Sequence, residues 1–177
     1  ATEQLGASPD FPFPLPWAMA PDNKTLALIN ATSLTDTNLA TLSLAKGGGF
    51  THLLHDPAIS ENEPSISPDG RRVAFHRPSN GTTDIWQMDI GKAILTRLWS
   101  DPSGHWSHSP LWSPDGSKIV FTFAPKFWGD LYIKGLEGGQ DEQLLLESAQ
   151  EKAATDWSRD GRFLLYMSLD PKNAHDI

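Results

Sequence analysis

One turn motif occurs four times along the chain at a nearly constant interval. Successive turn aspartates are 47, 46 and 45 residues apart. The four segments are Pro21-Asp22-Asn23, Ser67-Pro68-Asp69-Gly70, Ser113-Pro114-Asp115-Gly116 and Ser158-Arg159-Asp160-Gly161. A period of roughly 40–50 residues is typical of propellers and other repeat arrays. The chain is therefore expected to contain several copies of one small structural unit.

A second aspartate recurs in step with the first, 14, 15, 15 and 16 residues after each turn aspartate. We interpret these residues as caps at the start of a strand. A structural need recurs with every repeat, whereas an active site normally occurs once, so both aspartate series are predicted to be structural. The second series is Asp36, Asp84, Asp130 and Asp176.

The second repeat shows what one unit encodes. A short extended segment at residues 63–67 leads into Pro68, Asp69 and Gly70, which supply a fixed φ, a side-chain hydrogen bond and a positive φ for a tight turn. Alternating or β-rich segments follow at residues 71–76, 84–90 and 93–98. Four short antiparallel strands per repeat are therefore predicted. The turn residues expected to be structural are Asp22, Asp69, Gly70, Asp115, Gly116, Asp160 and Gly161.

The predicted fold is all-β, a propeller of four-stranded antiparallel blades. Each twisted sheet has two apolar faces, which it can cover only by packing on neighbouring blades around a channel. About three and a half blades are expected, from a ring of six to eight, because the fourth repeat stops inside its third strand. A parallel β-helix is disfavoured. A closed four-bladed ring with one incomplete blade is the remaining alternative. The expected boundaries are a Pro-rich irregular lead at 1–16, then blades at 17–60, 61–107, 108–152 and 153–177.

Composition excludes several classes of partner. The net charge is −8, from 14 basic and 22 acidic residues, and the bases are scattered rather than clustered. Nucleic-acid binding needs a basic stripe and is not predicted. The chain has no cysteine, which excludes disulfides and thiolate metal sites. No apolar stretch of 18 residues occurs, so no membrane span is predicted in this segment.

No complete catalytic set can be read from the sequence. A Gly-x-Ser-x-Gly nucleophile elbow and a phosphate-binding loop are both lacking. His105 and His108 are three residues apart, but a zinc site needs three or four ligands and no partner completes one. We therefore predict a non-enzymatic segment without catalytic, cofactor or metal residues. Aromatic and imidazole side chains on loops can anchor a partner. The alternative is that the tryptophans cover blade ends and the histidines are solvated. The candidates are His105, Trp106, His108 and Trp128.

Two repeats carry a resemblance to a known family. Residues 67–75 followed by 84–89, and residues 113–121 followed by 130–132, resemble the TolB-like, WD-like propeller repeats of bacteria. More finely, residues 144–166 look like the extracytoplasmic propeller regions of bacterial serine/threonine kinases and winged-helix regulators. The resemblance implies a periplasmic or otherwise extracytoplasmic compartment.

The predicted function is a protein-interaction or sensing module that binds a protein or peptide through rim loops. The alternative is the substrate-gating propeller of a prolyl-oligopeptidase or dipeptidyl-peptidase relative, whose catalytic domain lies outside this segment. An open arc leaves two apolar blade faces uncovered, so self-association is also predicted.

Overall fold

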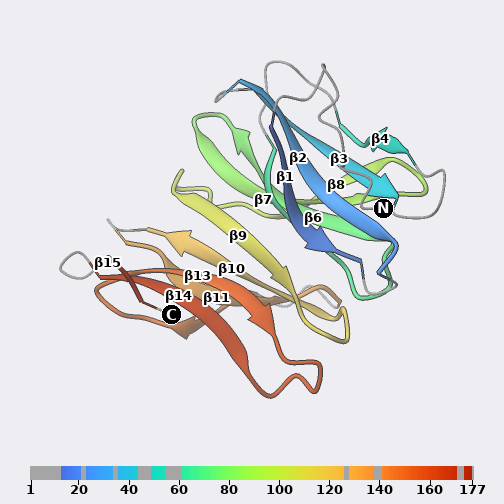
Figure 1. Cartoon of the computed structure of the whole chain (residues 1–177). Helices are drawn as coiled ribbons and strands as arrows, with labels where there is room; N and C mark the ends of the chain where they lie inside the picture. The colour runs from blue at the N-terminus through green and yellow to red at the C-terminus, as the bar shows by residue number, and fades with distance from the viewer. Residues whose placement is uncertain are drawn as a thin grey trace.

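The computed structural model describes residues 13–20, 23–33, 36–43, 49–54, 61–125, 128–137, 141–170 and 174–176. All regular structure in these residues is β-strand. Strands that are consecutive in sequence pair antiparallel within each repeat, so every repeat forms one blade (Figure 1). The predicted all-β architecture of four-stranded antiparallel blades is confirmed.

The strands follow the repeats from the first blade to the fourth. The first blade contains β1 (Phe13–Met19), β2 (Thr25–Ser33), β3 (Asp36–Ser43) and β4 (Phe50–His52). The second contains β5 (Asn62–Ile66), β6 (Arg72–Ser79), β7 (Thr82–Asp89) and β8 (Ile94–Trp99). The third contains β9 (Trp106–Trp112), β10 (Lys118–Ala124), β11 (Asp130–Gly135) and β12 (Gln143–Leu146). The fourth contains β13 (Glu151–Trp157), β14 (Leu164–Asp170) and β15 (Ala174–Asp176).

The first strand of each blade lies on the inside of the array. Strand β1 contacts β5, β5 contacts β9, and β9 contacts β13, so these four strands surround a common axis. Figure 1 shows the blades following one another from the blue first blade to the red fourth blade. The second and third blades are also joined by one parallel bridge, between Thr83 and Trp106.

The apolar core lies between blades rather than within one. Phe75 and Phe121 occupy the same repeat position, six residues after the turn aspartate, and both are fully buried. Phe75 belongs to a cluster between the first and second blades, and Phe121 belongs to one between the second and third. A third cluster joins Val120 and Leu131 to Ala154 of the fourth blade. Because each face is covered by the next blade, stability depends on stacking.

Strand boundaries differ from the sequence-based ones by a few residues. Strand β1 begins at Phe13, inside the lead that was expected to be irregular to residue 16. Within the described residues β1 pairs with β2 alone, and proline is tolerated in such an edge strand. This explains how Pro14 and Pro16 fit. Strands β9 and β13 begin at Trp106 and Glu151, two residues before the predicted starts of their blades.

Candidate functional site

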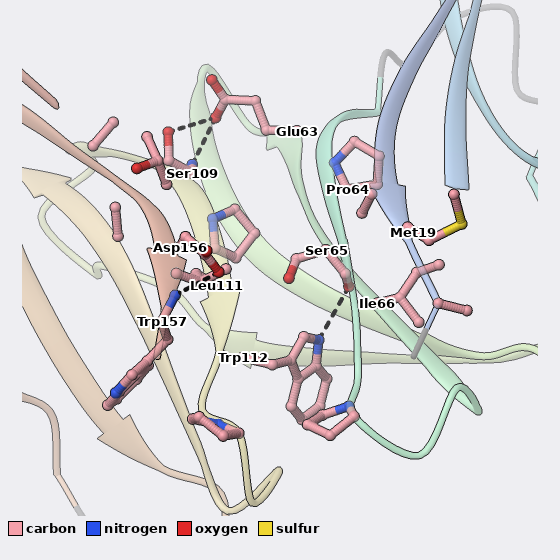
Figure 2. A pocket seen from close by; sticks show the side chains of 18 of the residues that line it. Met19, Glu63, Pro64, Ser65, Ile66, Ser109, Leu111, Trp112, Asp156 and Trp157 are labelled. Atoms are coloured by element: carbon pink, nitrogen blue, oxygen red, sulfur yellow. Dashed lines mark hydrogen bonds between the residues drawn. The ribbon is translucent and has the colours of Figure 1, made fainter. Parts of the chain in front are cut away.

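A cavity of about 900 Å³ lies between the inner strands. It is lined from all four blades, by residues of β1, β5, β9 and β13, by the turns that follow them, and by Met167 of β14. Figure 2 shows Glu63 of β5 directed toward Ser109 of β9, Ile66 of β5 on the side of Met19, and Asp156 and Trp157 of β13 beside Leu111. The cavity is therefore the channel of the propeller.

Each inner strand contains a β-bulge at the same place in the repeat. The inner strand has one residue more than its partner between Pro16 and Ala18, between Asn62 and Ser65, opposite the step from Val120 to Thr122, and between Ala154 and Asp156. In the second and third blades the bulge contains a non-glycine residue with positive φ, 52° at Glu63 and 51° at Ser109. A bulge bends its strand and re-aims a side chain. Here it turns the side chains of Glu63 and Ser109 toward each other.

Glu63 is the centre of a polar cluster that joins the second and third blades. One carboxylate oxygen lies 3.1 Å from Nδ1 of His76 and accepts hydrogen bonds from the backbone N–H of Ser109 at 2.6 Å and from its hydroxyl at 2.9 Å. Nδ1 of His108 lies 3.7 Å from the same oxygen. Burial raises the pKa of Glu63, but the hydrogen bonds and the two imidazoles outweigh it and lower this pKa to about 2.

His108 continues the cluster into the fourth blade. Its Nε2 lies 2.9 Å from an oxygen of Glu151, whose other oxygen accepts the backbone N–H of Gly129 at 2.7 Å. The hydrogen bond with His108 holds the pKa of Glu151 below its usual range. His108 was predicted to lie in a loop, but it lies within β9 and is half-buried. The physical reason is that β9 begins early, at Trp106.

His105 and Trp106 lie at one end of the channel, which we call the loop rim and define as residues 100–106, 125, 128 and 129. The ring Nδ1 of His105 lies 2.5 Å from a carboxylate oxygen of Asp101, which also accepts the backbone N–H of His105 at 3.0 Å. The Trp106 side chain is 62% exposed, although its backbone is the first residue of β9 rather than part of a loop. The structure therefore separates His105 from His108, because each imidazole has a different carboxylate partner.

Trp128 is the other loop-rim candidate. It lies between β10 and β11 and is half-buried. The register places its loop at the same end of the third blade as Trp106, since Phe123 pairs with Asp130 and Ala124 pairs with Trp106.

The repeated turns lie at the opposite end, which we call the turn rim and define as residues 67–71, 113–117 and 158–162. In each turn the aspartate accepts a hydrogen bond from the serine two residues earlier and one from the backbone N–H two residues later. The serine hydrogen bond is the main cause that lowers the pKa of Asp115 to about 2. The glycines have φ of 71°, 70° and 72°. They are Gly70, Gly116 and Gly161; Asp22 lies outside the described residues.

Comparison with known proteins agrees with this geometry. The profile of the TolB beta propeller domain matches residues 15–175. The chain belongs to this TolB β-propeller family. A curated relative, an uncharacterized protein of Agrobacterium fabrum, is 26% identical over 137 residues, which cover 70% of this chain and 45% of the relative.

Solved TolB structures share the fold. TolB from Acinetobacter baumannii superposes with a TM-score of 0.75 at 21% identity, covering 92% of this chain and 39% of its own. A putative TolB from Agrobacterium tumefaciens gives 0.72 at 21% identity, covering 86% and 53%. A prolyl endopeptidase gives 0.60 at 16% identity, covering 88% and 25%. The chain thus spans about half or less of the length of these relatives.

Proposed function

We propose that this TolB propeller segment is a non-enzymatic protein-interaction module, which binds a protein or peptide through its loop rim. The observation that supports this most is Trp106, a 62% exposed tryptophan on a fixed strand end. Tryptophan supplies a large contact area at a low entropic cost and is enriched among the residues that dominate binding energies.

The backbone of Trp106 pairs with Thr83 on one side and with Ala124 on the other. The neighbouring Ser107 donates its backbone N–H to the Thr83 hydroxyl at 3.0 Å and its own hydroxyl to the Thr83 carbonyl at 2.6 Å. The Thr83 hydroxyl in turn donates to the Ser107 carbonyl at 2.7 Å. A pre-organised anchor loses little conformational freedom on binding, which favours affinity. His105, fixed on Asp101, lies beside Trp106 and adds a polar group to the same surface.

The compartment proposed for this module is periplasmic or otherwise extracytoplasmic, by membership of the TolB family. Among the described residues no helix is long and apolar enough to cross a membrane. We propose a protein partner and not a nucleic acid, because the net charge of −8 on this chain opposes binding to phosphates.

The function is tested with random peptides displayed on phage and selected on the immobilised chain. Selected peptides are then measured against Trp106→Ala and against Phe163→Ala. Phe163 is a matched control, because it is also an exposed aromatic residue, at 64%, but follows the turn rim of the fourth blade. We expect the Trp106 variant to lose about tenfold in affinity or more, as for a central anchor, while the Phe163 variant keeps its affinity.

A third variant separates the proposal from the gating alternative. Asp156 lines the channel, away from the loop rim. Loss of peptide binding with Asp156→Ala but not with Trp106→Ala would contradict rim binding and support a propeller whose channel admits peptides.

The proposal includes self-association through uncovered blade faces. A large apolar side chain remains exposed on the fourth blade, that of Leu165 at 51%. Exposed apolar patches commonly mark interaction surfaces.

A further inference from the structure

The hairpin between β6 and β7 ends in the residue pair Asn80-Gly81. Ser79, the last residue of β6, pairs with Thr82, the first residue of β7, so the loop between these strands has two residues. Both have positive φ, 50° at Asn80 and 86° at Gly81, as in the type I′ turn that Asn-Gly favours. The strand pairing thus places this pair at the tip of a hairpin, where Asn80 is exposed.

The two groups that can react with each other at this tip are unprotected. Within the described part of the chain, neither the side-chain amide of Asn80 nor the backbone N–H of Gly81 has a hydrogen-bond partner. A Cβ built on Gly81 would meet no atom within 4 Å, so the space beside it is open. Glycine has no side chain to shield its nitrogen, and its backbone rotates freely. Gly81 is also the only glycine in the sequence that follows an asparagine.

We propose that Asn80 is a site of spontaneous deamidation. The Gly81 nitrogen gives up its proton and bonds to Cγ of Asn80, the Cγ–Nδ2 bond breaks, and the side-chain nitrogen leaves as ammonia with that proton. A water molecule then opens the resulting succinimide ring at either carbonyl, which leaves aspartate or isoaspartate at this position. The net reaction consumes water and releases ammonia, and it needs neither an oxidant nor a cofactor.

Asn23 provides a comparison within the same chain. It is also exposed and also left-handed, with a φ of 55°, but the residue that follows it is Lys24. A residue with a Cβ has fewer allowed backbone conformations than glycine, and its side chain crowds the attacking nitrogen. We therefore expect Asn23 to keep its amide while Asn80 loses it, which separates the effect of the glycine from the effect of exposure.

Conversion to isoaspartate affects the loop rim through Thr82 and Thr83. A Cβ built on Gly104 would lie 3.4 Å from the Thr82 methyl group, so the hairpin packs against the loop before β9. Thr83 exchanges hydrogen bonds with Ser107, beside the Trp106 anchor. Isoaspartate adds a carbon to the backbone of a two-residue loop and so removes the turn geometry on which the strand pairing depends. Deamidation therefore loosens the hold on Trp106, a consequence that matters for binding only if the proposed function of the loop rim is correct.

The modification is measured by mass spectrometry of tryptic peptides while the protein is incubated at mildly alkaline pH. Peptide 73–92 contains Asn80 and no other asparagine. We expect it to gain the mass difference between a hydroxyl and an amino group before the peptide with Asn23 changes. The rate should rise in proportion to the hydroxide concentration, because the attacking nitrogen must lose its proton. An isoaspartyl methyltransferase should then methylate peptide 73–92. No gain in this peptide, or an equal gain at Asn23, would overturn the proposal.

The effect on the loop rim is measured by amide hydrogen exchange at Ser107, whose N–H donates to the Thr83 hydroxyl at 3.0 Å. Exchange should be faster in the deamidated protein than in the fresh protein. Asn80→Gly is the matched control, because Gly-Gly also supports a type I′ turn but has no amide to lose. Its mass and its Ser107 exchange should stay constant during the incubation.

Unchanged Ser107 exchange after full deamidation would overturn the effect on the loop rim. Equally fast exchange in fresh Asn80→Asp, which carries the charge without the added carbon, would overturn the role of the backbone change. Both measurements use the protein without a peptide, so their failure and the failure of rim binding are distinguishable.

Discussion

The ammonium group of Lys152 lies 2.9 Å from a carboxylate oxygen of Asp130, and both side chains are buried. Lys152 belongs to β13 of the fourth blade and Asp130 to β11 of the third, so this ion pair crosses a blade interface. Lys152 also donates to the carbonyl of Gln150 at 2.7 Å, and Asp130 accepts the backbone N–H of Ser148 at 3.1 Å. The pair thus attaches the last blade to the array.

Removing one partner of this pair should destabilise the protein strongly. Lys152→Ala leaves the Asp130 carboxylate buried without its cation, which we expect to lower the free energy of unfolding by about 3–5 kcal/mol. The double variant Asp130→Asn/Lys152→Met removes both charges and keeps an oxygen for Ser148. It should lie within about 1–2 kcal/mol of the wild type. Urea unfolding measures both, and a single variant as stable as the double one would contradict the prediction.

Acid should weaken the contact between the second and third blades through Glu63. Its folded-state pKa of about 2 is below the ordinary value of 4.5, so the ionised form contributes stability above pH 4.5. That contribution is lost as the pH falls from 4.5 toward 2. The full shift corresponds to at most about 3 kcal/mol. Glu63→Gln should flatten the dependence of unfolding free energy on pH in this window.

The matched control for this acid effect is Glu137→Gln, which alters an exposed carboxylate elsewhere on the third blade. It should leave the pH dependence as steep as in the wild type. Equal flattening by both variants would show that the effect comes from net charge rather than from the Glu63 cluster.

Substitution of the turn glycine of the fourth blade should destabilise the protein through backbone strain and not through a steric clash. Gly161 has a φ of 72°, and a Cβ added there meets no atom within 4 Å. Gly161→Ala should therefore cost about 1–2 kcal/mol, the penalty for an alanine in left-handed conformation. Gly161→Asn should cost less, because asparagine tolerates this region, as Asn23 does with a φ of 55° in the first repeat. Thermal melting of the two variants should rank them in that order.

Gly129 should be sensitive to substitution because there is no space for a side chain at this position. A Cβ at this position would clash with Thr122 and with the carboxylate of Glu151. Thr122 is fully buried and its hydroxyl donates to the Lys152 carbonyl at 2.6 Å, so it cannot move away freely. We expect Gly129→Ala to cost about 1–3 kcal/mol by overpacking, measured by urea unfolding. A variant that also carries Thr122→Ser, which removes the obstructing methyl group, should recover part of this loss.

The architecture could be predicted from the sequence because the turn residues repeat and act locally. Asp69 and Gly70 make their turn with hydrogen bonds that span two to five residues, so the signal lies within one short segment. The blade order follows from four such signals in series.

The candidate site could be predicted only in part, because the side chains that meet in it depend on the register of strand pairing. Trp106 was named as a candidate and its side chain is exposed, but it begins β9 instead of lying in a loop, and Glu63 and Glu151 were missed. Their partners are 46 and 43 residues away, and the bulges that aim Glu63 and Ser109 at each other depend on strand pairing. The one signal that could have pointed to them is that Glu63 and Ser109 occupy equivalent repeat positions.

The second aspartate series was predicted to begin strands, which holds for Asp36 and Asp130, the first residues of β3 and β11, but not for Asp84. Asp84 is the third residue of β7 rather than a strand-start cap, and its carboxylate lies 3.4 Å from Arg97. Asp130 does begin β11, but its main contact is with a lysine of the next blade. A periodic spacing identifies positions that matter in every blade, without saying which partner each one meets.

The recurring bulge of the inner strands separates the shape of the channel from its chemistry. The extra residue is present in all four blades, whereas the side chains it presents differ from blade to blade: an acid at Glu63 and a hydroxyl at Ser109. The backbone geometry at these points is thus the same in every repeat, whereas the identity of the side chain differs between repeats. Substitution at a bulge can therefore change the chemistry of the channel in one blade while the shape of the backbone stays the same in all four.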